Sequence, residues 1–437
     1  MNEEGSKSSE GLVRVIGTRA LGTNIFNMVV GAGIFVLPGV VAAKLGPAAI
    51  IAYLICAVAI GLIFLCYAEI GSRVTRSGGS YAYIEEAFGP FAGFVSSMLL
   101  WFGWAVLSDA AILIAMIETI AIAVPKLHEP LWRFLFIIVL FTFLVVTNVR
   151  GVKSGVRLYI FNTIAKFVPL AMLLVVGMFF INFDNLVITE WPSFENIGAA
   201  TLILIFAFSG AECALNASGE ISNPEKTVPR GILLGMGSIF FLYLGLQTVA
   251  QGVLGPELAN NTEAPLAAAA NEIFGSWGVQ LLLVGGAISI FSTLSGDILV
   301  TPRVVFASAR DGNLPKILAK VHPKYNTPYI SIIFFALVIG GLALTGTFKP
   351  LAVMASGSIL IVYAGVSLAA LRLRFRDGVP SEGQFKFPGK SIIPLLSCLV
   401  IGWMLWQLTL EEAIGLLILV GISIGIYVLQ KVIKKSE

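Results

Sequence analysis

Charged and histidine side chains are scarce in this sequence of 437 residues. Asp, Glu, Lys and Arg together make up 12% of it, histidine occurs twice, and 57% of the residues are hydrophobic. Mean hydropathy is +0.92. Soluble domains carry about 25% charged residues, so this composition excludes a soluble globular protein. Both histidines, His128 and His322, fall in loops between apolar stretches. We therefore expect no histidine metal site in the apolar stretches, and neither a metal nor another cofactor.

Cysteine is scarce as well, and its placement excludes a disulfide framework. Cys56, Cys66, Cys213 and Cys398 all fall in apolar stretches without metal-ligand spacing. We interpret them as free, buried thiols. The sequence also lacks basic runs interleaved with aromatic residues, so the net charge of +3 does not indicate a nucleic-acid partner.

Long apolar stretches fill most of the sequence instead. Each is long enough to cross a hydrocarbon core about 30 Å thick at about 1.5 Å per residue. We predict an all-α integral membrane protein with twelve transmembrane helices and no second domain. The expected spans lie near 20–43, 47–71, 91–123, 131–148, 157–181, 197–217, 230–252, 276–306, 328–345, 350–371, 391–409 and 412–430. The third and eighth are long enough to be tilted or to protrude.

Basic residues are unevenly distributed between the two sides of this arrangement. Of the 28 Lys and Arg residues, 23 lie on the side of the amino terminus, one lies within a span, and four lie opposite: Lys44, Lys126, Arg133 and Lys349. Cytoplasmic loops carry the excess of Lys and Arg. We therefore expect a multi-pass plasma-membrane protein with both termini in the cytoplasm. The polar leader before the first span has no small-residue cleavage site, so that span should be retained.

Two of the spans contain an interruption of small residues. Gly31-Ala32-Gly33 interrupts the first, and Phe208-Ser209-Gly210 followed by Glu212 interrupts the sixth. Either stretch alone more often marks close helix packing. Because the first five spans are an odd number, the next five are inverted relative to them, and the interruptions occupy corresponding positions. Paired discontinuous helices in inverted halves indicate a substrate site near the midplane of a secondary transporter.

The expected organisation is therefore a 5+5 inverted repeat with discontinuous helices 1 and 6, plus two C-terminal helices. It divides the chain into a cytoplasmic leader at 1–19, a first repeat at 20–181, a second repeat at 197–371, two more helices at 391–430 and a cytoplasmic tail at 431–437.

The two interruptions suit a zwitterion. Free amides where the helix resumes after Gly33 would form a helix N-terminus that favours a carboxylate. Carbonyl groups at the end of the first half of the sixth helix would favour an ammonium, so main-chain atoms would hold the substrate and side chains would select its R group. The candidate substrate contacts are Val30, Gly31, Ala32, Gly33, Ile34, Phe206, Ala207, Phe208, Ser209 and Gly210.

Four motifs, in this order, resemble those of the amino acid, polyamine and organocation (APC) transporters with a leucine-transporter-like fold. They are VGAGIF at 30–35, YAEIG at 67–71 with RSGGSY at 76–81, FAFSGAE at 206–212 with NPEK at 223–226 and VPR at 228–230, and ARDGNLP at 309–315 with TP at 327–328. The resemblance covers nearly the whole chain and implies alternating access. It also implies that Phe206 is an aromatic gate on the outer side, and that Trp104 and Ser108 lie near the side-chain pocket. For Trp104, ordinary helix packing is an equally good explanation.

Lys166 is a charged residue deep within the fifth span. It lies nine residues beyond Arg157, about 13 Å along a helix, too far for its stem to carry the ammonium comfortably to water. It resembles the fifth-helix lysine of the sodium-independent branches of the family, whose ammonium contacts the first half of helix one and hydroxyls of helix eight. Here Ser289, Ser292 or Thr293 could supply them. We predict transport without sodium.

Four acidic residues lie within the spans and away from their ends. Glu212 resembles a glutamate implicated in proton sensing in the basic amino acid and diamine antiporters, and a hydrogen-bonded structural carboxylate is the equal alternative. Asp109 could hold the ammonium of a basic side chain or form a structural pair. Asp297 could line the cytoplasmic route, and Glu118 is expected to be structural.

These features predict a secondary active amino acid transporter rather than an enzyme, driven by protons or working by exchange. A basic amino acid or diamine antiporter is an alternative, as is a transporter-derived sensor that binds amino acid without flux. A channel should show a filter loop or a polar stripe, and an enzyme should show a clustered nucleophile and base, but the sequence shows neither. Expected partners are an L-amino acid, a proton and the lipid bilayer, with the protein a monomer or a weak homodimer.

Overall fold

The computed structural model describes residues 14–75, 77–150, 156–310, 312, 314–378, 384–387, 389 and 391–436. For residues 156–162, 217 and 433–436 it describes the backbone alone. The rest of the predicted leader, and Arg76, Asp311 and Asn313 of the motifs, lie outside the described residues. The described part is helical, and its one β-bridge joins Ile16 to Ile221. The side chain of Arg157, which marks the expected membrane edge near Lys166, is likewise outside the description.

Helices follow one another with few long connections. In chain order they are α1 (Thr18–Val29), α2 (Gly33–Leu45), α3 (Ala49–Arg73), α4 (Gly79–Phe88), α5 (Pro90–Met98), a π-helical segment (Leu99–Val106), α6 (Leu107–Ala121), α7 (Pro130–Arg150), α8 (Val156–Gly177), α9 (Phe194–Phe208), α10 (Ala211–Ala214), α11 (Pro224–Leu254), α12 (Pro265–Phe274), α13 (Ser276–Arg310), α14 (Tyr329–Thr345), α15 (Phe348–Asp377), α16 (Ile392–Leu405) and α17 (Leu410–Ser436).

Long apolar helices lie along most of the predicted spans. Within the described residues, nine helical segments are long and apolar enough to cross a membrane, and α14 and α16 are apolar but shorter. The first of the nine runs from α2 through α3 as one segment, Gly33–Arg73, because only a 3-10 turn separates the two helices. An integral membrane protein is therefore confirmed. The count of twelve crossings and the inverted repeat stay predictions.

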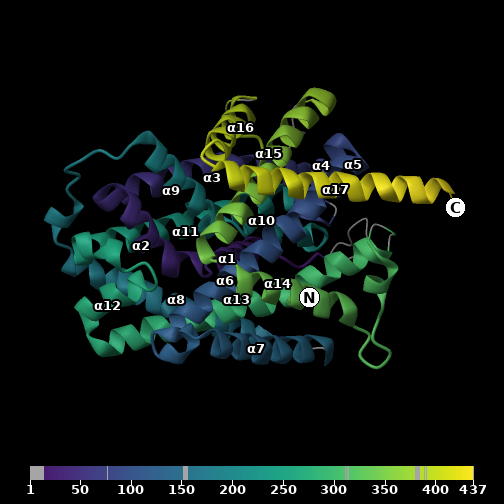
Figure 1. The fold of residues 1–437 in the computed structure, drawn as a ribbon. Coiled ribbons are helices and arrows are strands. Elements are labelled where there is room, and N and C mark those ends of the chain that lie inside the picture. Colours follow the sequence, from purple (N-terminus) through teal and green to yellow (C-terminus); the bar gives the residue numbers. More distant parts are fainter. Residues whose placement is uncertain are drawn as a thin grey trace, which may run out of the picture.

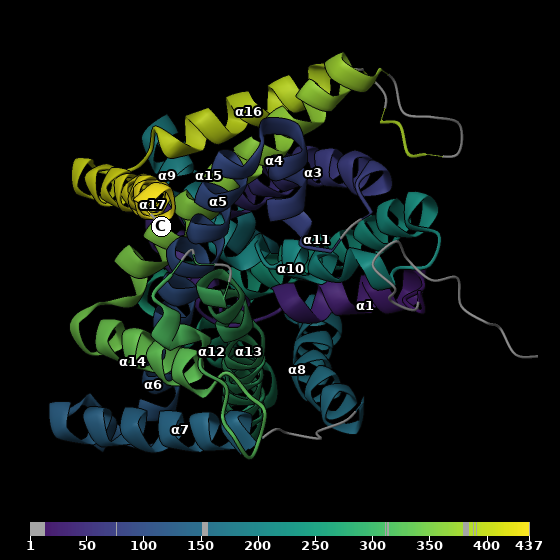
Figure 2. The same cartoon turned by 90° about the vertical axis from the view of Figure 1, so that its right-hand side faces the viewer.

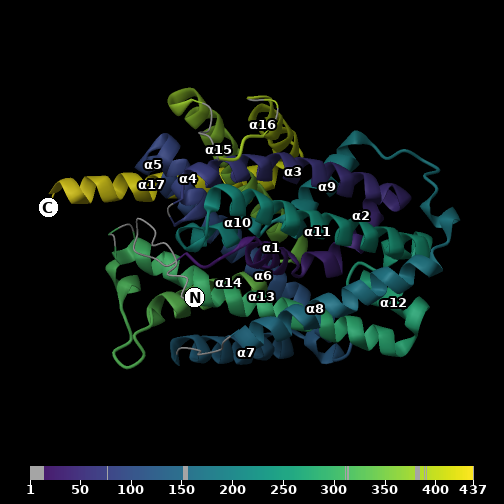
Figure 3. The same ribbon diagram turned by 180° about the vertical axis from the view of Figure 1, so that it is seen from behind.

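Several long helices, among them α7, α13 and α17, run across the view of Figure 1. Figure 2 places α7 at one edge of the molecule and α16 at the opposite edge, with α10 and α11 between them. Seen from the front and from behind (Figures 1 and 3), α7 lies at the lower edge of the molecule and α15 and α16 lie at the upper edge. This arrangement surrounds the two interrupted helices with other helices.

Glycine allows α1 to approach α11 closely. A Cβ at Gly231 would lie 2.7 Å from Leu21 Cδ2, and a Cβ at Gly235 would lie 2.6 Å from Ile25 Cγ2. Carbon atoms in contact are normally about 3.5–4.0 Å apart, so neither position admits a larger residue without separating the helices. Small residues at the interface are the usual means of close helix packing in membranes.

The start of the described chain is bound to the segment that follows α10. The amides of Val15 and Ile16 donate to the Glu220 carbonyl at 2.9 and 3.0 Å, and the amide of Ser222 donates to the Ile16 carbonyl at 3.0 Å. The amino-terminal segment is therefore bonded to the chain just after the predicted sixth span.

The cysteine prediction needs one correction. All four thiols are free, and Cys56 and Cys66 are buried, but Cys213 and Cys398 are partly exposed. An apolar neighbourhood in the sequence does not distinguish a core position from one at a helix surface, which explains the difference.

Candidate functional site

The first interruption separates α1 from α2. Val30 takes an extended conformation (φ −71°, ψ 92°), and the helix resumes at Gly33 after Ala32. The first amides of a helix have no preceding turn to supply acceptors, so those at the start of α2 remain available to a ligand. All of the residues predicted as contacts here are buried: Val30, Gly31, Ala32, Gly33 and Ile34.

The second interruption separates α9 from α10. Ser209 is extended (φ −83°, ψ 162°), and Gly210 has a φ of +117°, which L side chains rarely adopt. The last carbonyls of α9 have no following turn to supply donors. They therefore present partial negative charge at this break. Phe206, Ala207, Phe208, Ser209 and Gly210 are all buried.

The two interruptions lie against each other. A Cβ at Gly33 would lie 2.7 Å from the Cα of Ala207, and a Cβ at Gly210 would lie 2.9 Å from the carbonyl oxygen of Met28. The helix N-terminus of α2 thus packs on the C-terminal end of α9. Opposite partial charges from two helix ends meet in one buried region.

Aromatic rings cover this region on the α9 side. The Phe206 ring lies 6.1 Å from the Trp104 ring and 5.5 Å from the Phe348 ring, in edge-to-face geometry. Trp104 belongs to the π-helical segment, which the sequence analysis did not foresee, and Ser108 follows it in buried surroundings. The predicted neighbours Phe206 and Trp104 are in contact, while Phe348 was not foreseen because ring contacts between distant helices leave no local signal.

Lys166 is 3% exposed. Its ammonium donates to the carbonyl of Asn27 at 2.8 Å and to that of Val30 at 3.0 Å. The side chain therefore does not reach toward water. Its contact with the end of the first half-helix is the one that the family resemblance implied. The positive charge caps the C-terminal end of α1, where the helix dipole favours a cation.

Two hydroxyl groups support the same helix end. Ser289 of α13 donates to the Val30 carbonyl at 3.5 Å, and Tyr243 of α11 donates to the Val29 carbonyl at 3.2 Å. Thr293 donates to the Ser289 carbonyl and lies beside Gly31, whose Cβ would be 3.4 Å from Thr293 Oγ1. Hydroxyls of α13 thus lie near Lys166, but those of Ser289 and Thr293 donate to carbonyls. Ser292 is partly exposed and has no hydrogen bond to Lys166 among the described residues.

The Glu212 carboxylate lies at the second interruption and accepts two hydrogen bonds. Its Oε2 accepts from the Gly210 amide at 3.0 Å and from the Tyr363 hydroxyl at 2.7 Å, and the side chain is 1% exposed. These bonds satisfy an orphaned amide at the start of α10. They are the bonds expected of a structural carboxylate, which was one of the two alternatives for this residue.

Asp109 and Asp297 meet although they lie on different helices. Their carboxyl groups, from α6 and α13, lie within hydrogen-bonding reach of each other. Asp109 is 0% exposed, and neither of its carboxyl oxygens accepts a hydrogen bond from a described donor. The sequence alone does not reveal this pair, because contacts between distant helices leave no mark in either local sequence.

Glu118 has the structural partners that its interpretation requires. Its carboxylate accepts from Arg133 at 2.8 Å and lies 3.6 Å from the His128 ring nitrogen. Glu118 lies near the C-terminal end of α6.

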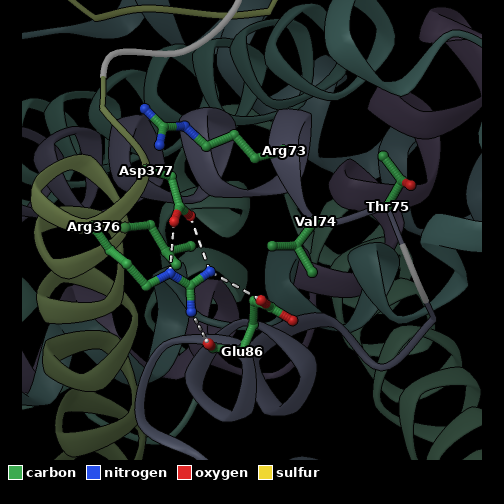
Figure 4. A pocket seen from close by; sticks show the side chains of 7 residues that line it. Arg73, Val74, Thr75, Glu86, Arg376 and Asp377 are labelled. Carbon is green, nitrogen blue, oxygen red and sulfur yellow. Dashed lines mark hydrogen bonds and ion pairs between the residues drawn. The ribbon is translucent and has the colours of Figure 1, made fainter.

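A network of charges joins α3 to α15 at the end of the bundle predicted to be cytoplasmic. Glu69 is 1% exposed and accepts two hydrogen bonds from the Arg374 guanidinium, one of them at 2.6 Å, and a third from Arg73 at 3.3 Å. Nearby, Arg376 bonds both Asp377 and Glu86 (Figure 4).

A cavity of about 350 Å³ opens beside these side chains. Its lining includes Arg73, Glu86, Arg376 and Asp377. Arg376 bonds the carboxylates of Asp377 and Glu86 there (Figure 4), so its positive charge is already balanced by neighbouring negative charges.

Comparison with known proteins agrees with this geometry. The model of a family described as amino acid permease matches residues 17–427. The serine/threonine exchanger SteT of Bacillus subtilis (strain 168) is 30% identical over 431 residues, covering 94% of this chain and 95% of that protein. The branched-chain amino acid permease BcaP of the same strain is 27% identical, with 92% and 89% covered.

A plant protein, the vacuolar cationic amino acid transporter 4 of Arabidopsis thaliana, is 26% identical, with 80% of this chain and 62% of that protein covered. The family match spans nearly all of the chain, and the two interrupted helices are in the places that the resemblance implied. The chain therefore belongs to the amino acid permease family, within the APC superfamily of amino acid transporters.

Proposed function

We propose that this protein is a sodium-independent secondary transporter of L-amino acids that works by alternating access. The observation that carries the proposal is the meeting of two helix interruptions, with the N-terminus of α2 against the C-terminal end of α9. Substrate carboxylate binds the amides of Ala32, Gly33 and Ile34, and the amino group binds the carbonyls of Phe206 and Ala207.

Lys166 supports the sodium-independent part of the proposal. Its ammonium already binds the carbonyls of Asn27 and Val30, so a positive charge is present beside the broken helix without a metal ion. A sodium ion at the same carbonyls would be repelled by that charge. Lys166, Ser289 and Thr293 therefore hold the end of α1 in place of a bound ion, and Glu212 holds the start of α10.

The aromatic rings beside the interruptions support neutral amino acids as the first substrates to test. The ring of Phe206 closes the region from the side of α9, and Trp104 adds a second apolar wall. Two of the relatives are named for serine and threonine and for branched-chain amino acids. Basic amino acids or diamines are a second candidate class, favoured by the buried Asp109 and by a relative named for cationic amino acids.

Flux measurements with purified protein in liposomes test the proposal. A panel of labelled neutral and basic L-amino acids is supplied to empty vesicles and to vesicles preloaded with unlabelled amino acid. We expect uptake that is unchanged when choline replaces sodium. Loss of uptake in choline would refute the role of Lys166, and binding without any flux would identify a sensor instead.

The preloading arm separates two energetic modes. Uptake confined to preloaded vesicles means obligatory exchange. Uptake into empty vesicles that follows an imposed pH gradient means proton coupling.

The proposed setting is the plasma membrane with both termini on the cytoplasmic side. It is supported by the uneven distribution of Lys and Arg. Protease or label accessibility of the termini in intact cells and in inverted vesicles tests it.

A further inference from the structure

We propose that Asp109 and Asp297 form a shared proton-binding site and that one proton on this pair is co-transported with the amino acid. Transport of a proton rests on the proposed function, whereas binding of a proton by the pair does not. Both residues come from helices that flank the interrupted segments, and neither has a role in holding the substrate backbone.

The state of Asp109 carries the argument. Its carboxyl group is fully buried, both oxygens lack a described donor, and its neighbour is the carboxyl group of Asp297. Two carboxylates at this distance in a medium of low dielectric constant repel strongly and cannot both stay ionised. One proton placed between them removes a charge and makes an O–H to O⁻ hydrogen bond, which is the arrangement of a shared-proton dyad.

The surrounding groups offer no permanent neutralising charge. From α10, Glu212 and Cys213 lie close enough for their charges to interact with the pair, and both are acidic. From α8, Lys166 is bound to the carbonyls of α1. From α15, the Tyr363 hydroxyl donates to Glu212.

The other elements packed on α6 and α13 carry their charges elsewhere. At the outer end of α6, Glu118 is paired with Arg133 of α7 and with His128. On α13 itself, Arg303 lies six residues beyond Asp297, about 9 Å along the helix. The other ionisable groups on the packed elements are Lys126, Arg150, Glu272, Arg310, Lys316, Tyr329, Lys349, Arg372, Arg374, Arg376 and Asp377.

The pair is joined to the substrate region along two helices. Ser289, Thr293 and Asp297 are spaced by four residues and share one face of α13. Ser289 touches the Val30 carbonyl and Thr293 lies beside Gly31, so Asp297 is one turn, about 6 Å, beyond the first interruption. On the other helix, Asp109 lies five residues after Trp104, whose ring contacts Phe206.

Release of the proton follows from the difference in exposure within the pair. Asp109 is fully buried, while Asp297 is partly exposed. The O–H bond at Asp297 breaks, the proton passes to water, and two carboxylates remain. Two charges are tolerated only when water reaches the pair, so proton release requires the site to open and uptake of a proton accompanies its closure.

Proton-driven accumulation in liposomes is the first test. One proton per neutral amino acid would concentrate substrate about tenfold for each pH unit of gradient when the membrane potential is clamped, since one pH unit equals one factor of ten. We expect this for the native sequence, with alkalinisation of the outer medium on substrate addition. In Asp109→Asn and Asp297→Asn, exchange into preloaded vesicles should continue while gradient-driven accumulation falls to about onefold.

Glu118→Gln is the matched control, since it removes an acid from the same helix α6 at a site with its own partners. It should keep the tenfold accumulation. If Asp109→Asn does not fold, Asp297→Asn alone is used for the test, because Asp297 is the more exposed residue of the pair. Infrared difference spectra over a pH series provide a readout independent of flux: a protonated carboxyl band should be present in the native protein and in Glu118→Gln and absent from a variant that carries both Asp109→Asn and Asp297→Asn.

The outcomes separate the two proposals. Two results would overturn the proton site and leave the transporter proposal intact. One is exchange by the native protein without any gradient-driven accumulation, and the other is tenfold accumulation by either Asn variant. Competition by lysine that both Asn variants lose would make the pair a site for a basic side chain, and also overturns it. If the native protein moves no amino acid, the proposed function fails, and the infrared band alone decides whether the pair binds a proton.

Discussion

Replacing Gly33 with alanine should abolish high-affinity binding while the fold survives. The added Cβ would lie 2.7 Å from Ala207 Cα and 2.8 Å from Ala207 Cβ, whereas carbon contacts are normally about 3.5–4.0 Å. The start of α2 must therefore move away from α9 by about 1 Å. Overpacking of this kind costs about 1–3 kcal/mol.

The consequence for binding follows from the position of the shift. Gly33 supplies one of the amides proposed to hold the carboxylate, and α9 supplies the carbonyls proposed to hold the amino group. A misplacement of about 1 Å at a positioning element can cost about 100-fold. We expect the dissociation constant of the transported amino acid to rise about 100-fold, equal to about 2.7 kcal/mol.

Two further glycines make this a graded experiment. A Cβ at Gly31 meets Thr293 Oγ1 at 3.4 Å, and Gly61 in α3 has nothing within 4 Å of its Cβ position. We expect Gly31→Ala to weaken binding less than about threefold and Gly61→Ala to leave binding unchanged. Scintillation proximity binding with purified protein gives the affinities, and thermal unfolding checks the fold. Binding by Gly33→Ala within threefold of the native protein, or equal loss in Gly61→Ala, would refute the reasoning.

Three other substitutions test separate contacts. Lys166→Ala removes both hydrogen bonds to the carbonyls of Asn27 and Val30. Because charged hydrogen bonds contribute about 1.5–3 kcal/mol each, uptake in liposomes should fall at least about 100-fold while the protein stays monodisperse. Lys126→Ala is the control, and full activity of Lys166→Ala would contradict the proposed role of Lys166. Phe206→Ala removes a ring with two aromatic neighbours and should raise KM about tenfold or more, measured as initial uptake rates, with Phe91→Ala as the control on an exposed ring. Glu69→Gln leaves the Arg374 guanidinium without a carboxylate and should destabilise the protein by about 3 kcal/mol in thermal unfolding; an unchanged Tm would mean that the pair contributes nothing.

The interruptions and the lysine were predictable because each leaves a local signal. Gly31-Ala32-Gly33 and Phe208-Ser209-Gly210 stand out within apolar stretches, and a lysine at 166 is conspicuous deep in a span. Burying an ammonium without hydrogen-bond acceptors is costly in free energy, and the end of an interrupted helix offers free carbonyl acceptors. A buried lysine is therefore expected at such a helix end. The structure places Lys166 on such a helix end.

Contacts between distant helices could not be predicted in this way. The pairing of Asp109 with Asp297 and that of Glu212 with Tyr363 join residues far apart in the chain, and their register depends on how α6, α13 and α15 pack. The π-helical segment Leu99–Val106 has no composition that distinguishes it from the α-helix around it. Partial exposure of Cys213 and Asp297 likewise depends on which neighbours cover a helix face.

The attachment of the amino-terminal segment to residues 220–222 offers a way to observe transport motions directly. Val15 is 69% exposed, yet its amide is bonded to the carbonyl of Glu220. A fluorophore or spin label on a Val15→Cys variant would therefore travel with residues 220–222, just after α10, while its side chain stays in contact with solvent. Replacing Cys213 and Cys398, the two partly exposed native thiols, would leave Val15→Cys as the accessible attachment point among the described cysteine positions.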